Sequence, residues 1–199
     1  MLDRSIPFYN LILKCSCPPS AAVRLPPGFS LRLYQAGDED AWAALECSIG
    51  DFRTPAQARQ YFLHTYGSRQ TALQQRCLFA VNSAGQPAGS CIAWQDVRCG
   101  QPVSSLHWLV VHPAFRGQGL GRALCLAAMR LFEQADAYPV YLHTQPWSWR
   151  ALMLYAEIGF RLQKTDSFAE YENQYAQGMA VLRGILSPKQ YQWLSDCAE

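Results

Sequence analysis

The sequence of 199 residues predicts an α/β domain. Runs of β-forming residues alternate along the chain with segments whose apolar residues recur every three to four positions, as in amphipathic helices. Half of the side chains are hydrophobic and 16% are charged, so the chain can bury a sizeable core and has too few charges for a disordered protein. A glycine-rich loop joins one β-type run to the strongest helical pattern, and we expect chemistry there.

Strands are predicted where β-forming residues run together or alternate with polar ones. Phe29, Leu31 and Leu33 alternate with Ser30 and Arg32, which is the pattern of a half-buried strand. Turn-forming residues separate two further runs, which we interpret as a hairpin. The expected strands cover residues 29–33, 77–81, 88–94, 104–111, 140–144, 160–165 and 178–182, with the hairpin between the second and the third.

Helices are predicted from capping residues and from apolar positions spaced for one helical face. Asp38 can cap one helix, and Thr54 with Pro55 and Gln57 forms a capping box with proline at the first helical position. After the glycine-rich loop, residues 120–135 keep one face apolar over about four turns. Further helices are expected at residues 148–158, ended by Gly159, and after Ser187. The expected apolar faces are Trp42, Leu45 and Ile49; Ala58, Tyr61, Phe62 and Thr65; and Ala151, Leu154, Tyr155 and Ile158.

The chain divides into three expected segments. Residues 1–28 form an N-terminal strand-loop extension, residues 29–183 form the main domain, and residues 184–199 form a C-terminal helix packed on it. The apolar stretch near the N-terminus resembles a secretory signal only in part, because Pro7 and Lys14 interrupt it. We therefore expect no secretion signal.

Charge and cysteine content exclude several classes of partner. Seventeen Lys and Arg against fifteen Asp and Glu give a net charge of +2, without the basic runs that nucleic acids or anionic membranes attract. No apolar stretch approaches the roughly 20 residues of a membrane-spanning helix. The eight cysteines are scattered, several in apolar runs, which indicates buried reduced thiols and a cytoplasmic protein. Cys15 and Cys17 lack a second ligand pair, so we expect no metal.

The glycine-rich loop suits an anionic ligand. Glycines let backbone N–H groups turn toward a ligand, and the following helix directs its positive dipole end at the same place. The loop matches neither a Walker phosphate-binding loop nor a dinucleotide fingerprint, because Arg122 stands where the latter needs a third glycine. A tight turn that is glycine-rich for packing reasons is the alternative. The loop runs Arg116, Gly117, Gln118, Gly119, Leu120, Gly121 and Arg122.

Two motifs together are more specific than the loop alone. The stretch Leu109-Val110-Val111-His112-Pro113-Ala114-Phe115-Arg116-Gly117-Gln118-Gly119-Leu120-Gly121 resembles the central motif of the GNAT superfamily of N-acetyltransferases. The stretch Ala151-Leu152-Met153-Leu154-Tyr155, followed by Gly159-Phe160, looks like the later motif of that family. One departure is Ser148, where the family often has Asn.

The resemblance covers residues 29–183 and implies a mixed central β-sheet flanked by helices on both faces. It implies acetyl-CoA as cosubstrate, with the pantetheine arm and acetyl group along Leu109, Val110 and Val111, and the pyrophosphate on the amides of residues 117–122. Arg116 and Arg122 would add positive charge. Members of the family transfer the acetyl group directly in a ternary complex, so no nucleophile is required, although Cys91 can be tested as one.

Acetyl transfer from a thioester to an amine needs one base and one acid. The resemblance assigns the acid to Tyr155; the alternative is a tyrosine that only packs in the core. His107 is the base candidate, because imidazole accepts a proton near neutral pH, and one family member has a histidine base at this place of the strand. Strand alternation puts His107 on the face opposite Trp108. A core histidine is the alternative, and we interpret His112 as structural.

The predicted activity is therefore acetyl-CoA-dependent N-acetylation by an enzyme acting on a small-molecule amine. A peptide or protein acceptor is the first alternative, and a non-catalytic acyl-CoA-binding module is the second. Glu46 or Asp51 can pair with a cationic acceptor, although simple surface solvation of both acids is the alternative. Aromatic acceptors can stack on Phe52 or on Trp147 and Trp149. The protein is expected to be a monomer or a homodimer.

Overall fold

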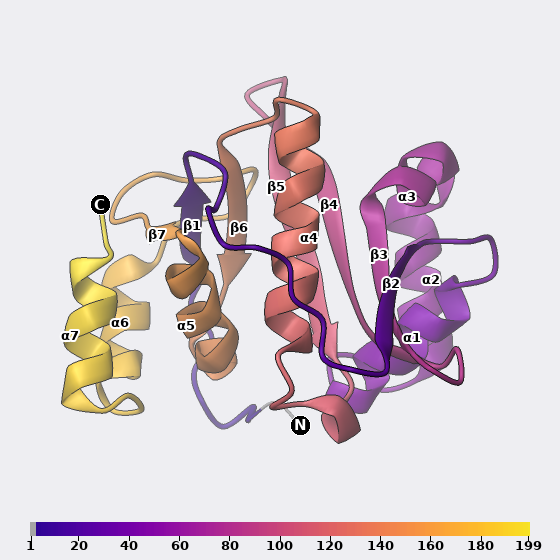
Figure 1. Cartoon of the computed structure of the whole chain (residues 1–199). Helices are drawn as coiled ribbons and strands as arrows, with labels where there is room; N and C mark the ends of the chain where they lie inside the picture. Colours follow the sequence, from indigo (N-terminus) through magenta and orange to yellow (C-terminus); the bar gives the residue numbers. More distant parts are fainter. Residues whose placement is uncertain (1–2) are drawn as a thin grey trace. The chain divides into compact units, whose positions relative to one another are not determined.

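The computed structural model describes residues 3–199 and contains one seven-stranded sheet in the order β2-β3-β4-β5-β6-β1-β7 (Figure 1). The strands are β1 (Leu11–Cys15), β2 (Phe29–Leu33), β3 (Cys77–Asn82), β4 (Pro87–Arg98), β5 (Gln101–Val111), β6 (Val140–Thr144) and β7 (Arg161–Leu162). The α-helices are α1 (Glu39–Ile49), α2 (Pro55–Tyr66), α3 (Gln70–Arg76), α4 (Leu120–Gln134), α5 (Trp149–Ile158), α6 (Tyr175–Arg183) and α7 (Pro188–Asp196).

The sheet is mixed, as predicted. β5 and β6 run parallel, with Ser104 opposite Val140 and Ser105 opposite Tyr141. The pairs β2–β3, β3–β4, β1–β6 and β1–β7 are antiparallel. The predicted α/β class and the mixed sheet with flanking helices are therefore confirmed.

The chain forms two compact units, and β4 and β5 contribute residues to both. The first unit contains Ala21–Trp94 and Leu106–Leu131, and the second contains Asp3–Ser20, Gln95–Ser105 and Phe132–Glu199. The division at residues 28 and 183 that the sequence suggested stays a prediction.

The first unit is built around an aromatic core between its strands and the helices α1, α2 and α3. Trp42, Phe62, Tyr66 and Phe79 are all fully buried in this core. Figure 1 shows α4 in front of β4 and β5. A Cβ on Gly89 of β4 would lie 2.5 Å from the Val110 oxygen and 3.0 Å from Cδ1 of Leu124, so only glycine allows β4 to pack this closely against β5 and α4.

In the second unit, β1 is an interior strand of the sheet. It pairs with β6 on one side and with β7 on the other, and Leu11, Ile12 and Leu13 are fully buried. The predicted N-terminal strand thus exists, at Leu11–Cys15, and it belongs to the sheet. The capping box predicted at Ser187 is confirmed at the start of α7.

The prediction of a strand at residues 178–182 is wrong, because these residues lie in α6. Gly178, Met179 and Leu182 are buried, a spacing that fits one helical face. The strand predicted at 160–165 is reduced to Arg161–Leu162. Beyond it, the side chain of Asn173 donates hydrogen bonds to the carbonyls of Gln163 and Asp166 and closes a loop.

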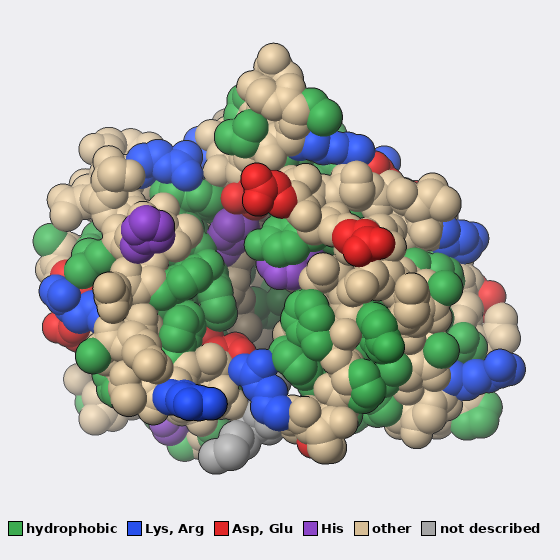
Figure 2. Space-filling view, turned by 180° about the vertical axis from the view of Figure 1, so that it is seen from behind, with side chains coloured by type: hydrophobic (Ala, Val, Ile, Leu, Met, Phe, Trp, Pro, Cys, Tyr) green, Lys and Arg blue, Asp and Glu red, His purple; other side chains and the backbone are tan. Residues whose placement is uncertain are grey.

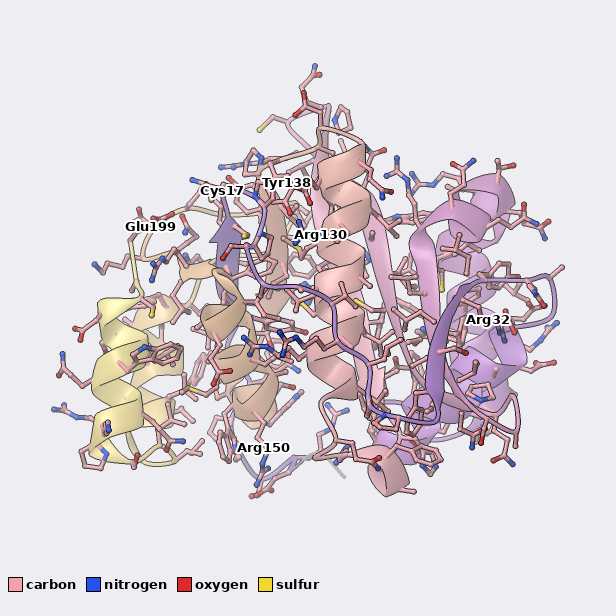
Figure 3. All side chains as sticks on the ribbon, viewed as in Figure 1. Cys17, Arg32, Arg130, Tyr138, Arg150 and Glu199 are labelled. Carbon is pink, nitrogen blue, oxygen red and sulfur yellow. The ribbon has the colours of Figure 1, made fainter. Side chains whose placement is uncertain are left out.

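Two predicted caps take a different form. Asp38 precedes α1, but its carboxylate does not cap the helix. It pairs with Arg32 of β2, which is labelled in Figure 3. Nη2 of Arg32 lies 2.8 Å from Oδ1 of Asp38. Ser148 precedes α5, but its hydroxyl accepts a hydrogen bond from the Gln145 side chain. In both cases a nearby side-chain donor has replaced the helix amides as partner. Thr54 does cap α2, through the Gln57 amide.

The helix boundaries of α1, α2, α4 and α5 agree with the predictions to within a residue or two, but two of the apolar faces are shifted. In α2 the buried residues are Ala58, Phe62 and Tyr66, whereas Tyr61 is 38% exposed. In α5 they are Leu152, Tyr155, Ala156 and Ile158. The short helix α3 was not predicted, because Leu73 is its single buried residue and it shows no apolar face.

Candidate active site

The glycine-rich loop has the backbone conformation that the anion-binding interpretation requires. Gly117 has φ +77° and Gly119 has φ +89°, a region that residues with a Cβ rarely adopt. A Cβ on either residue would meet nothing within 4 Å, so packing does not explain these glycines. The loop leads directly into Leu120, the first residue of the 15-residue helix α4. Free N–H groups and the helix dipole favour an anion at such a helix start.

Arg116 is tied to the end of β5. Its Nε donates a hydrogen bond to the Val111 carbonyl over 3.3 Å. His112, predicted to be structural, caps the short 3₁₀-helix Pro113–Phe115, because its Nδ1 accepts from the Ala114 amide. The turn between β5 and α4 is thus held by side chains at both of its ends.

The end of β5 carries the three residues that the resemblance assigns to pantetheine. Val110 is buried in the core of the first unit, whereas Leu109 and Val111 are half-buried. The register of β5 with β6 covers Ser104 and Ser105 and therefore ends before Leu106.

Trp108 interrupts the alternation of β5. Its φ of +49° lies in the left-handed region, which is uncommon for a bulky residue and marks local strain. His107 contacts Tyr66 of the helical layer, and Trp108 contacts Trp42, at a centroid distance of 5.4 Å, and Tyr61, at 5.3 Å. The prediction that His107 and Trp108 lie on opposite faces is therefore wrong, because this left-handed residue brings both side chains to the α1 and α2 side of the sheet.

The imidazole of His107 contacts the hydroxyl of Tyr66. Nδ1 of His107 and the hydroxyl oxygen of Tyr66 are 2.8 Å apart, and the His107 side chain is half-buried. Tyr66 is fully buried and contacts the Trp94 ring nearly at right angles, at 4.8 Å. Sequence reasoning missed Tyr66, because its place in the α2 pattern shows burial but not a partner 41 positions away.

Glu46 is buried, so the alternative of a solvated surface acid is wrong for this residue. It is 1% exposed, and its Oε1 has no hydrogen-bond partner among the described residues. Burial, with a smaller contribution from the Asp51 charge, raises the pKa of the Glu46 carboxyl well above its ordinary value. Nε1 of Trp42, one turn earlier on α1, is also buried without a partner in the described part of the chain.

The aromatic residues proposed for acceptor stacking already contact other side chains. Phe52 packs on Trp42, Tyr61 and Trp108, at centroid distances between 5.4 and 5.9 Å. In the second unit, Trp147 contacts the ring of Phe8 and lies under the guanidinium of Arg4, and Trp149 lies under that of Arg150. Phe52 therefore belongs to the same aromatic group as Trp108, while Trp147 and Trp149 are partly covered by other residues.

Tyr155, the candidate acid, lies on α5 in the second unit. Its side chain is 8% exposed, and its ring contacts Phe160 edge-on at 5.9 Å. The ring thus belongs to the core of its unit, so replacing Tyr155 by Phe conserves the packing.

Cys91 is unsuited to nucleophilic attack. Its thiol is fully buried, and that burial raises the pKa of Cys91 far above the ordinary value, which disfavours the reactive thiolate. All eight cysteines are free thiols, and five of them are buried. Sγ of Cys15 contacts the carbonyl of Cys17, and burial raises the pKa of Cys15 to about 11.

Two surface properties bear on possible partners. On the face drawn in Figure 2, basic and acidic side chains are scattered and form no continuous basic patch. Among residues 3–199, no helix has both the length and the apolar character needed to cross a membrane.

Residues 41–160 match the model of the acetyltransferase (GNAT) family. Since the match covers more than half of the sequence, the chain belongs to this family. The resemblance seen in the two motifs is thereby confirmed.

Relatives and structural neighbours agree with this assignment. A mycothiol acetyltransferase of Saccharomonospora viridis is 29% identical over 164 residues, which cover 78% of this chain and 51% of the relative. The chain thus spans about half the length of such relatives. A GCN5-related N-acetyltransferase of Sphaerobacter thermophilus superposes with a TM-score of 0.59 at 21% identity, over 79% of this chain and 50% of the other. An aminoglycoside N-acetyltransferase in complex with CoA gives 0.54 at 18% identity, over 77% and 99%. At these identities the structures show a shared fold.

Proposed function

We propose that this protein is an enzyme that transfers an acetyl group from acetyl-CoA directly to the amine of a small molecule. The observation that carries the proposal is the loop from Gly117 to Gly119, whose left-handed residues stand at the start of α4 with open space around them. Family membership supports the same chemistry. Acetyl-CoA supplies the acetyl group as an activated thioester.

The cosubstrate would be held by the loop and by the end of β5. The backbone amides of residues 117–122 would supply the N–H donors that a pyrophosphate requires, and Arg122 would add positive charge. The backbone of Leu109 to Val111 at the end of β5 would bind the pantetheine arm in the manner of an added strand. Arg116 contributes mainly by fixing the turn, since its Nε is bonded to Val111.

Two side chains move the protons. His107 removes one proton from the amine as the new carbon–nitrogen bond forms. The hydroxyl of Tyr155 gives its proton to the sulfur as the carbon–sulfur bond breaks. The variants His107→Gln and Tyr155→Phe each remove one of the two groups.

A small-molecule acceptor is favoured over a peptide. Beside His107, the half-buried aromatic residues Phe52 and Trp108 pack against the core of the first unit, and such side chains suit a small acceptor. The Saccharomonospora viridis relative is called a mycothiol acetyltransferase, a name that indicates a small-molecule acceptor for that protein. A peptide acceptor and an acyl-CoA-binding module without turnover remain the two alternatives.

The deciding experiment is a screen of acetyl-CoA turnover against amines and short peptides, measured by release of the CoA thiol. The proposal requires turnover with at least one small amine, and that turnover must fall in the variant His107→Gln. Turnover with peptides alone would replace the substrate class. CoA binding without any turnover across the panel would instead indicate the binding module.

A further inference from the structure

We propose that Trp108 is a specificity-determining residue of the acceptor site and that, together with Phe52 and Tyr61, it selects amines that carry an aromatic ring. The inference rests on the proposed function, since it names the class of amine that the enzyme acetylates. The observations behind it are the left-handed backbone of Trp108 and the partial exposure of three rings that contact one another. We call Phe52, Tyr61 and Trp108 the aromatic wall.

The backbone of Trp108 decides where its indole lies. Along a regular strand, neighbouring side chains point to opposite faces, so the indole would lie on the face opposite to His107. The φ of +49° instead turns the indole to the side of α1 and α2, where the His107 side chain also lies. A strained conformation persists only where the surrounding contacts over-determine it, and such positions cluster at ligand-binding sites. The indole is therefore held on the side of the sheet that carries the candidate base.

Three rings hold the indole of Trp108 in place. Its centroid lies 5.4 Å from that of Trp42, 5.7 Å from that of Phe52 and 5.3 Å from that of Tyr61. Phe52 and Tyr61 contact each other at 5.4 Å. Trp42 is fully buried and anchors the group, whereas Phe52 and Trp108 are half-buried and Tyr61 is 38% exposed. The aromatic wall is thus one set of touching rings that solvent reaches and that a buried tryptophan supports.

The chemistry of the aromatic wall suits a ring as its ligand. Apart from the hydroxyl of Tyr61 and the indole N–H of Trp108, its side chains offer only the edges and faces of rings. Aromatic rings attract one another in edge-to-face and offset arrangements, beyond what the burial of their area contributes. A ring bound to the wall keeps its attached amine on the side of the sheet where His107 lies.

Charge does not explain the aromatic wall. Glu46 of α1 is buried, and burial, with a smaller contribution from Asp51, raises the pKa of its carboxyl, so Glu46 presents no exposed charge to an acceptor. Asp51, the residue before Phe52, carries a negative charge that attracts the ammonium form of an amine with or without a ring. The wall therefore makes a selection among amines that charge alone does not make.

The test compares two amines of similar size, benzylamine and cyclohexylmethylamine, which differ in whether the ring is aromatic. Each amine is titrated into the full chain saturated with CoA, which has no acetyl group to transfer, so binding is measured without turnover. Nuclear magnetic resonance of protein labelled with ¹⁵N-tryptophan reports the indole N–H of each tryptophan separately. The signal that disappears in Trp108→Phe belongs to Trp108.

Benzylamine should shift the signal of Trp108 and leave those of Trp147 and Trp149, which lie in the second unit, unchanged. It should bind about three- to tenfold more tightly than cyclohexylmethylamine, the range that an aromatic contact adds to the burial of apolar area. In Trp108→Leu, which keeps an apolar side chain but no ring, this preference should be lost. The CoA-induced rise in melting temperature should persist in the variant and shows that it is folded.

The matched control is Trp193→Leu. Trp193 of α7 is 37% exposed and lies in the second unit, so this variant removes a partly exposed indole that does not belong to the aromatic wall. It should keep the full preference for benzylamine. A preference that falls equally in both variants would be a general effect of losing a surface indole and would overturn the proposal. If Trp108→Leu does not fold, Tyr61→Leu, which changes the most exposed ring of the wall, should lower the preference instead.

Two results in the parent protein overturn the proposal without any variant. One is equal affinity for the two amines. The other is a response to benzylamine at Trp147 or Trp149 with none at Trp108, which would place the ring in the second unit. The proposed function fails by a different measurement, the absence of thiol release with every amine and peptide of the screen. Thiol release with amino sugars but not with aromatic amines would keep the proposed function and overturn the role of Trp108.

Discussion

Gly178 of α6 faces Leu11 of β1 so closely that a Cβ on the glycine would lie 2.6 Å from Cδ2 of the leucine and 2.9 Å from its Cγ. Leu11 is fully buried in the interior strand of the second unit and has little room to move aside. The absence of a side chain at position 178 is therefore what lets the helix lie on this strand.

Replacing Gly178 by Ala is expected to destabilise the protein. Overpacking of a core costs about 1–3 kcal/mol, and the better helix propensity of Ala returns about 1 kcal/mol. We expect a net loss of about 1 kcal/mol, which lowers the melting temperature by roughly 2–4 °C in a chain of this size. Calorimetry of the variant checks the prediction.

Gly184, at the end of the same helix, provides the control. A Cβ there would have ordinary contacts, with the Val181 oxygen at 3.5 Å, so Gly184→Ala should change the melting temperature little. In a Leu11→Ala background the clash is gone, and Gly178→Ala should then be neutral or stabilising. A loss that persists in that background would contradict the close approach as its cause.

Local signals predicted the parts of the fold that local sequence determines. The glycine-rich loop and α4 were found because the glycines stand directly before a 15-residue segment with one apolar face. α6 was mistaken for a strand because residues 178–182 are a short apolar run, which fits a strand as well as a buried helix. The reason for a glycine at position 178 is its contact with Leu11, which is far away in the sequence. Propensity scales describe single residues and therefore cannot predict a contact between residues that are distant in the sequence.

The site shows the same division between local and distant information. His107 and Tyr155 could be proposed from motifs, and the chain is a member of the family that those motifs indicate. The left-handed backbone of Trp108 could not be predicted from the sequence, because a bulky residue such as tryptophan rarely has a positive φ. The contact between His107 and Tyr66 joins a strand to a helix, and only the tertiary structure brings the two rings together.

The loop is expected to be the site of CoA binding, which Gly119→Glu tests. A carboxylate at this position would meet the pyrophosphate with like charge, and the positive φ of Gly119 adds strain. CoA should raise the melting temperature of the parent protein by mass action, and this rise should be lost in the variant. Thermal unfolding with and without CoA measures it.

Gly85→Glu is a matched control for this variant. Gly85 lies in the turn between β3 and β4, has φ +76°, and a Cβ there would also meet nothing within 4 Å. The two glutamates therefore cause similar strain in different loops. If both variants keep or both lose the shift caused by CoA, the loop before α4 is not the binding site.

Tyr155→Phe is expected to lower turnover by roughly 100-fold, the usual effect of removing a general acid. The ring packs against Phe160, and the substitution keeps that contact, so the melting temperature and the CoA-induced shift should persist. Thiol release under saturating acetyl-CoA, with an amine found in the screen, gives the rate. Full activity in this variant would leave Tyr155 with a packing role only.

The stability of the protein should depend on the charge of Glu46. Its pKa is raised in the folded protein, first by burial and then by Asp51, so the folded state binds the proton more tightly than the unfolded chain does. The stability that this proton confers is complete below the ordinary carboxyl pKa of about 4.3 and is lost as the pH rises toward the raised value. Glu46→Gln should therefore raise the melting temperature near pH 7 and change it little near pH 4.

Glu39→Gln should show the opposite sign. Partial burial disfavours ionisation of Glu39, but hydrogen bonds from its own amide, Tyr34 and Gly37, together with the charge of Arg59, hold its pKa below the ordinary value. Its contribution is therefore present above the ordinary carboxyl pKa and is lost as the pH falls through the lowered one. Glu39→Gln should lower the melting temperature near pH 7 and have a smaller effect in acid. Unfolding curves of both variants at pH 4 and pH 7 measure these changes in melting temperature. A Glu46→Gln variant that is less stable than the parent at pH 7 would contradict the prediction for Glu46, because it would mean that the buried carboxylate has a partner that stabilises its charge.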